Sequence, residues 1–151
     1  MRIVLLAALA LVVVEPTLAC SCAPLIATDK AMIQKTNRAE RVFVGRVLSS
    51  NFVDPESKHP LYREFKLRLT SSWKGDPARV VNVRSHVQRA ACGVELEVGE
   101  KYLIFAYSRG DGGLAVNHCS TRRYNHAREL IGALNARYSE GEAPSITHHG
   151  Y

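Results

Sequence analysis

The chain of 151 residues carries 20 basic and 14 acidic side chains, so its formal charge at pH 7 is +6. Its length suits one compact domain with its own hydrophobic core. Basic and aromatic residues are scattered rather than clustered, which argues against a nucleic-acid-binding surface and favours an ordinary soluble basic one.

Residues 1–19 have the three-part layout of a secretory signal. A positive start at Met1-Arg2 precedes an unbroken apolar run over residues 3–14, and small residues stand just before Cys20. The run is too short to span a membrane, which needs roughly 20 apolar residues. We therefore predict a signal peptide over residues 1–19, no transmembrane span, and a secreted mature chain that begins at Cys20.

A second interpretation exists at the same bond, because Ala19-Cys20 resembles the junction that is cut in bacterial lipoproteins. There a lipid is attached to the cysteine sulfur and the new amine is usually acylated. That pattern usually wants leucine one place earlier than Leu18, where this chain has Thr17. Lipidation would also leave an odd number of cysteines in an oxidising compartment. We favour plain secretion; in a bacterium the destination would be the periplasm or, for the lipidated form, the envelope.

The four cysteines, Cys20, Cys22, Cys92 and Cys119, constrain the fold further, since they allow three pairings. Cys20 and Cys22 cannot easily bridge each other, because a disulfide needs Cα atoms roughly 4.4–6.8 Å apart and suitably aimed Cβ atoms. Both remaining pairings tie the N-terminal segment to distant residues, and each bridge is worth ~4 kcal/mol on the chain-entropy model. A zinc site of four thiolates is the alternative, but its spacing is poor for zinc and export favours disulfides.

The first predicted elements are a short helix and a strand. Thr28 stands where it would cap a helix over residues 29–37. Residues 41–48 then alternate loosely around Val42, Phe43, Val44 and Val47, as a strand covered on both faces does.

A clearer strand follows at residues 64–70, where Phe65, Leu67 and Leu69 alternate with polar residues and Trp73 ends the apolar side. Further strands are predicted at residues 79–87, 101–107 and 114–118. Residues 110–113 make the hairpin turn between the last two, because glycine supplies positive φ. Arg109-Gly110-Asp111 also spells a cell-adhesion tripeptide, but the same letters suit a tight hairpin.

The last predicted element is a helix that is longer than the first. After Ser120 or Thr121 as cap, apolar residues recur at three- and four-residue steps, namely Tyr124, Ala127, Ile131, Leu134 and Tyr138. Residues 141–151 have no such periodicity and are interpreted as a flexible tail, in which the paired His148-His149 would bind nothing specific.

Five short strands with glycine turns and no alternating helices favour a mainly β domain over residues 20–140. The pattern suggests a small closed or nearly closed antiparallel barrel. It leaves the choice between a barrel and a sandwich open.

Six segments of the chain together resemble one protein family. They are Cys20-Ser21-Cys22-Ala23-Pro24, Val42-Phe43-Val44-Gly45-Arg46-Val47, Trp73-Lys74-Gly75, Ala91-Cys92-Gly93, Gly99-Glu100-Lys101-Tyr102-Leu103-Ile104-Phe105-Ala106 and Cys119-Ser120. They are similar to the N-terminal domain of the tissue inhibitors of metalloproteinases, and the C-x-C-x-P opening with cysteines at these distances is specific. The resemblance implies a five-stranded OB-fold barrel, also called a netrin-like module, with the disulfides Cys20–Cys92 and Cys22–Cys119.

The resemblance also implies a mechanism and a set of protease-binding residues. The free α-amine and the carbonyl of Cys20 would bind the catalytic zinc of a target metalloproteinase, which keeps an open position for such ligands. The chain itself would need no cofactor and would act as a monomer. Ser21 would point into the primed-side specificity pocket and Pro24 would keep the segment extended. The remaining contact residues would be Cys22, Ala23, Ala90, Ala91 and Cys92.

The sequence departs from the family in three places. The family's third disulfide in this domain has no cysteines here, and we expect no counterpart of its second, C-terminal domain. Residues 49–61, where some members have a long contact hairpin, form a short segment. Fewer peripheral contacts predict weaker or less selective inhibition.

Two other functions are weaker interpretations of the sequence. His86, His118 and His126, with Glu95, Glu97 or Asp111, could form a hydrolytic site on paper, but no nucleophile-elbow, HExxH or phosphate-loop motif accompanies them. The serious alternative is a non-inhibitory netrin-like binding module, secreted or lipid-anchored through Cys20, in which the disulfides are purely structural. That alternative stands because a fold does not determine a function.

Overall fold

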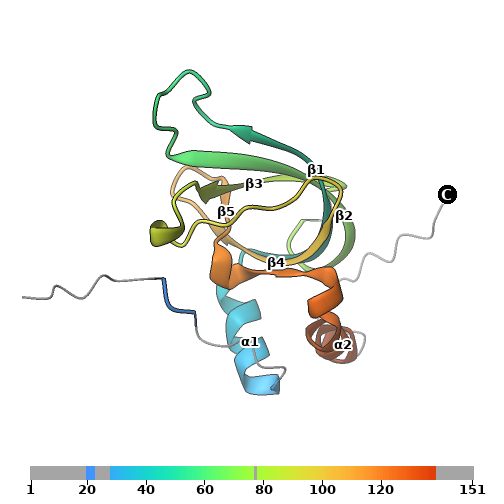
Figure 1. The fold of residues 1–151 in the computed structure, drawn as a ribbon. Coiled ribbons are helices and arrows are strands. Elements are labelled where there is room, and N and C mark those ends of the chain that lie inside the picture. The colour runs from blue at the N-terminus through green and yellow to red at the C-terminus, as the bar shows by residue number, and fades with distance from the viewer. Residues whose placement is uncertain (1–19, 23–27, 77, 139–151) are drawn as a thin grey trace, which may run out of the picture.

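The computed structural model describes residues 20–22, 28–76 and 78–138, and Figure 1 shows their arrangement. The regular elements are, in chain order, α1 (Asp29–Arg38), β1 (Arg41–Phe52), β2 (Tyr62–Lys74), β3 (Val80–His86), η1 (Arg89–Ala91), β4 (Lys101–Ser108), β5 (Leu114–Ala115), η2 (His118–Ser120), β6 (Thr121–Arg123), η3 (Tyr124–His126) and α2 (Arg128–Arg137). Here η marks a short 3₁₀ turn.

Five of the strands close into a barrel, which confirms the predicted fold. β1 pairs with both β2 and β4, β2 pairs with β3, and β4 pairs with β5, all antiparallel. The barrel closes where β3 meets β5 in parallel at Arg84 and Ala115. One contact of the barrel is therefore parallel, not antiparallel as the pattern suggested. β6 is an additional short strand, which pairs with β4 outside the closed ring.

Two hydrophobic cores lie on opposite faces of β1 and β4. Phe43 and Ile104 point into the barrel, where they pack with residues such as Phe65, Leu67 and Val83. The neighbouring residues in the strands face outward, against both helices; this second core contains Met32, Val42, Val44, Trp73, Leu103, Phe105, Leu130 and Leu134. Figure 1 shows the two helices together on one side of the barrel. The double coverage predicted for residues 41–48 is confirmed, and it explains why residues 42–44 of β1 and residues 102–106 of β4 are uninterrupted apolar runs.

The hairpin of β1 and β2 is longer than the sequence suggested. β1 was expected to end at Leu48 but continues to Phe52, and β2 begins at Tyr62 instead of Glu64. Ser49, Ser50 and Asn51 do not end the strand, because their backbone pairs with β2 while their side chains lie on an outer, partly exposed surface. The alternation in β2 is confirmed: Phe65 and Leu67 are fully buried, whereas Lys66 and Arg68 are exposed.

The C-terminal part differs most from the prediction. α2 begins only at Arg128, and it has ten residues, the same as α1. Ser120 and Thr121 do not cap it. Asn117 and Ser120 instead form a capping box around η2, and the backbone of Thr121–Arg123 is used by β6. Tyr124 consequently lies in η3 and is 41% exposed, while Ala127 and Leu134 are buried as expected.

Two smaller expectations also change. Thr28 occupies the N-cap position of α1 but makes no hydrogen bond with its side chain. The strand expected at residues 114–118 contains only Leu114 and Ala115, because His118 already belongs to η2. Within the described residues, no helix is long and apolar enough to cross a membrane.

Candidate functional site

Two disulfides hold the first described residues against the barrel. Cys20 is bonded to Cys92 and Cys22 to Cys119, and in each bridge the Cα atoms are 5.2 Å apart. The pairings implied by the family resemblance are therefore confirmed. The bridges lie against each other, with 3.9 Å between the sulfur atoms of Cys20 and Cys119. The zinc site of four thiolates is wrong, since every one of these sulfurs is used in a disulfide.

The Cys20–Cys92 bridge also bears on the lipoprotein interpretation. A bacterial lipoprotein carries its lipid as a thioether on this sulfur atom. In the structure, the sulfur of Cys20 is bonded to the sulfur of Cys92. A lipid on this sulfur and the Cys20–Cys92 bridge therefore exclude each other.

The turn that carries Cys92 is held by its own backbone. Cys92 ends η1 in the left-handed region, with φ 58°, and its N–H donates to the carbonyl of Arg89 at 3.0 Å. The N–H of Gly93 donates to the carbonyl of Gln88 at 3.0 Å. A Cβ atom on Gly93 would lie 2.2 Å from the carbonyl oxygen of His86, so only glycine lets the chain pass this closely.

A further contact joins the two disulfide segments to each other. The N–H of His118 donates to the carbonyl of Cys92 at 2.9 Å. Because His118 directly precedes Cys119, this bond holds the second bridge beside the first. The N–H of Val94 donates to the buried hydroxyl of Ser85 at 2.9 Å, which fastens the end of the Cys92 turn to β3.

Lys35 supports the second bridge from the helix side. Its ammonium group donates a hydrogen bond to the carbonyl of Cys119 and lies 5.3 Å from the centre of the Phe105 ring. Burial, and to a lesser degree the charge of Arg122, lowers the pKa of the Lys35 ammonium from 10.5 to about 8. Nothing in the sequence singled out Lys35, because its partner is 84 residues away. Gly93, by contrast, stands beside Cys92 in the family motif.

The predicted contact residues meet on one surface, which we call the N-terminal ridge and define as residues 20–22 and 90–92. Ser21, Ala90 and Ala91 are exposed, and the three cysteines between them are half-buried. In Figure 1 residues 20–22 lie beside η1, at the edge of the barrel. Ala23 and Pro24 lie outside the described residues, as do the predicted signal peptide and the tail at residues 141–151. The surface is small, uncharged and rich in backbone atoms.

The histidines of the hydrolytic alternative do not assemble a metal site. His86 packs against the ring of Tyr62, with 4.6 Å between ring centres, while His118 and His126 lie exposed in separate 3₁₀ turns. Among the described residues, the one group of three close potential ligands is Cys20, Cys22 and Cys119, whose sulfurs are oxidised.

Comparison with known families agrees with this architecture. The sequence model described as tissue inhibitor of metalloproteinase matches residues 18–147, which is most of the chain and includes all four cysteines. No curated protein matches the sequence closely enough to serve as a named relative. The family match supports a metalloproteinase-inhibitor-like role, because members of this family are inhibitors and not enzymes. The chain belongs to the family of tissue inhibitors of metalloproteinases.

Proposed function

We propose that this protein inhibits a zinc metalloendopeptidase by binding the catalytic zinc through its own N-terminus. Cleavage after Ala19 would leave Cys20 as the first residue, with a free α-amine next to its carbonyl. These two atoms can close a five-membered chelate ring on one metal ion. They would take the position of the water that performs hydrolysis, since catalytic zinc keeps one position open for water or substrate.

One observation carries the proposal. Cys20, which would bind the zinc, begins a segment of three residues, and a disulfide holds this segment at each of its two ends. Cys20 is tied to η1 and Cys22 to η2, and the hydrogen bond from His118 to Cys92 joins the two anchors. A segment that is already ordered loses little conformational entropy on docking, which improves affinity. A purely structural framework would not need the second cysteine to lie so near the first.

The ridge around Cys20 suits docking into an active-site cleft. Ser21 is exposed between the two bridges, so its side chain is free to enter the primed-side specificity pocket. Because serine is small and polar, it should discriminate little among enzymes. Ala90 and Ala91 would contact the enzyme next to it, and their short side chains let the backbone approach closely. We include Ala23 and Pro24 in the same contact surface.

The proposal needs export and correct processing of the chain. We propose that residues 1–19 are the signal peptide, that residues 20–140 form the inhibitory domain, and that residues 141–151 are a flexible tail. An extracellular location agrees with a family whose members are typically secreted. The partner would be a zinc metalloproteinase and the inhibitor a monomer.

A single added residue tests the mechanism. The mature protein starting at Cys20 is compared with the same protein carrying one extra alanine before Cys20, against a panel of zinc metalloproteinases. We expect the first to inhibit at least one enzyme and the second to inhibit none, because the extension converts the amine into an amide. Disulfide mapping and thermal unfolding of both proteins serve as the control for folding.

The same experiment separates the inhibitor from a non-inhibitory binding module. Equal inhibition by both proteins would contradict chelation through the amine. No inhibition by either protein, with both disulfides intact, would favour the module. Mass spectrometry of the N-terminus of the exported protein checks whether the chain begins at Cys20 with an unblocked amine.

A further inference from the structure

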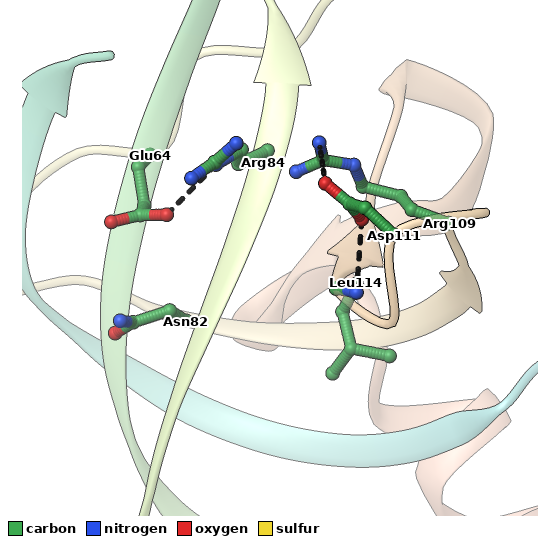
Figure 2. Close-up of a pocket in the computed structure, with 7 residues that line it drawn as sticks. Glu64, Asn82, Arg84, Arg109, Asp111 and Leu114 are labelled. Carbon is green, nitrogen blue, oxygen red and sulfur yellow. Dashed lines mark hydrogen bonds and ion pairs between the residues drawn. The ribbon is translucent and has the colours of Figure 1, made fainter.

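A small hollow lies on the outer surface of the barrel, away from the N-terminal ridge. It has a volume of about 220 Å³ and lies between β2, β3 and the hairpin that joins β4 to β5. Its lining residues are Glu64, Asn82, Arg84, Arg109, Asp111, Gly113 and Leu114, and we call it the hairpin hollow. Figure 2 shows these side chains. None of them belongs to the disulfide segments, so the hollow is a separate feature of the molecule.

Two arginines in the hollow are each held by a carboxylate. The Nε of Arg84 donates to Glu64 at 2.9 Å, and an Nη of Arg109 donates to Asp111 at 2.5 Å. Asp111 also accepts the N–H of Gly113 at 3.0 Å; this bond and the charges of Arg109 and Arg84 keep the pKa of Asp111 below its usual value. Each guanidinium is thereby oriented from one side. Figure 2 shows Arg84 reaching toward Glu64 and Arg109 lying beside Asp111, and the charge of Arg84 also acts on Asp111.

This arrangement accounts for the Arg109-Gly110-Asp111 tripeptide. Its arginine and aspartate pair with each other, and Gly112 adopts a φ of 81° in the predicted tight hairpin. An adhesion motif would have to present the two charges separately to a receptor. The tripeptide therefore builds one wall of the hollow, and Arg109 is fixed there instead of extending into solvent.

The surface next to the hollow is positively charged. Along β2, Lys66 and Arg68 follow Glu64 on the same outer face, because the alternate residues Phe65 and Leu67 point into the barrel. Neither Lys66 nor Arg68 takes part in any ion pair found among the described residues. Arg68 also stands directly opposite Arg46 of β1, and like charges in that position repel. An anion bound along this face would relieve that repulsion.

We propose that the hairpin hollow binds the acid group of a sugar, as the end or a unit of an anionic polysaccharide. Two arginines line one hollow, and the planar guanidinium group matches the two-oxygen geometry of a carboxylate. Barrels of this architecture use the face of their second and third strands and the β4–β5 loop to bind oligosaccharides and oligonucleotides. No aromatic ring lines the hollow for a base to stack on, so a sugar fits better than a nucleotide. Asn82 supplies an amide for hydroxyl groups.

Calorimetric titration of the protein with a galacturonate oligomer tests the proposal. Three further titrations serve for comparison. Free galacturonate shows whether a single acid group is enough for binding, and a neutral galactose oligomer shows whether the sugar binds without its charge. A single-stranded oligonucleotide tests binding of nucleic acid. We expect binding of the galacturonate oligomer, weaker binding of free galacturonate, and none of the neutral oligomer. Loss of one charge-assisted contact in Arg84→Gln or Arg109→Gln should raise the Kd about tenfold or more.

Three further variants keep the result interpretable. Arg128→Gln removes the same charge from an exposed position on α2 and should leave the Kd nearly unchanged. Arg109→Lys keeps the positive charge but loses the planar, two-pronged arrangement of the guanidinium donors. It should bind less tightly than the unchanged protein. Asn82→Glu places a carboxylate at the exposed floor of the hollow and should abolish binding without removing an ion pair. Thermal unfolding verifies that each variant is folded.

Four outcomes would overturn the proposal. The first is that the galacturonate oligomer does not bind, and the second is that Arg128→Gln and Arg109→Gln weaken its binding equally. The third is that Asn82→Glu binds the oligomer as tightly as the unchanged protein does. The fourth is that the oligonucleotide binds more tightly than the sugar. Equal weakening would mean attraction by overall charge alone. A preference for the oligonucleotide would point to a nucleic-acid surface instead.

Discussion

The N-terminal ridge and the hairpin hollow hold their residues in place by different means. The ridge is fastened by two disulfides and by backbone hydrogen bonds around Cys92. The hollow is ordered by ion pairs whose carboxylates are substantially exposed to water. Covalent bridges and partly buried backbone bonds are insensitive to salt, whereas exposed ion pairs are screened and contribute little stability.

The two kinds of fastening suit the two surfaces to different ligands. The ridge offers main-chain atoms and short side chains in a nearly fixed arrangement, which suits docking into a rigid cleft and binding a metal through backbone groups. The hollow offers charged side chains that can adjust, which suits an anionic ligand whose binding weakens with salt. The following substitutions test this contrast.

Removing one disulfide should damage the ridge more than any other change proposed here. We expect the double variant Cys22→Ser and Cys119→Ser to lower the free energy of unfolding by about 2–5 kcal/mol. Inhibition should also fall, because Cys22 would no longer order the residues behind Cys20. Urea unfolding and an inhibition assay measure the two effects.

The matched change in the hollow is Arg109→Gln, which breaks the ion pair with Asp111. Since that carboxylate is exposed, we expect no measurable change in Tm and no change in inhibition. The contrast fails if Arg109→Gln destabilises the protein as much as loss of the bridge does.

A methyl group at Gly93 should be the most damaging single substitution next to the ridge. In Gly93→Ala the new Cβ would meet the backbone oxygens of His86 and Gln88 at 2.2 and 2.7 Å, and backbone cannot yield as a side chain can. We expect a loss of more than about 2 kcal/mol in the free energy of unfolding. Thermal and urea unfolding provide the measurement.

Gly132→Ala is the control for this substitution. Gly132 lies within α2, and a Cβ there meets nothing within 4 Å. Alanine should stabilise the helix by about 0.5–1 kcal/mol. A similar effect of the two substitutions would show that the Cys92 turn is not as crowded as the structure indicates.

The third prediction concerns Lys35 and depends on pH. Its pKa is lowered from 10.5 to about 8 in the folded protein, chiefly by burial, so between these values the unfolded chain binds more protons than the folded one. The free energy of unfolding should therefore rise with pH over this range, as burial of the charge ceases to cost stability. Lys35→Met should lack this rise.

The measurement is the difference in urea stability between the unchanged protein and Lys35→Met at pH 7 and at pH 10. Other groups that titrate in this range, including Tyr107, are present in both proteins and cancel. We expect the difference to move in favour of the unchanged protein at the higher pH. A difference that is constant or moves the other way would contradict the burial of the Lys35 ammonium.

Much of the barrel follows from local pattern. The alternation around Phe65 and Leu67 predicts a strand with one wet face, and the apolar residues within residues 41–48 predict a strand covered on both faces; both are observed. The pattern was less reliable near Tyr124. Apolar residues at helical spacing there predicted a helix that begins near Tyr124, which is too early. The backbone of Thr121–Arg123 instead pairs with β4 as a short strand.

The cysteines and the motifs around them were sufficient to predict the family and both disulfides, because a short spacing such as Cys20-Ser21-Cys22 has few structural uses. Only the tertiary structure decided what surrounds those residues. Lys35 reaches Cys119, Gly93 passes against His86, and Arg84 and Arg109 line the same hollow. Each of these contacts joins segments distant in the chain or depends on how closely two backbones approach. The local sequence pattern indicates which face of a helix or strand is apolar, but it does not indicate which distant residue packs against that face.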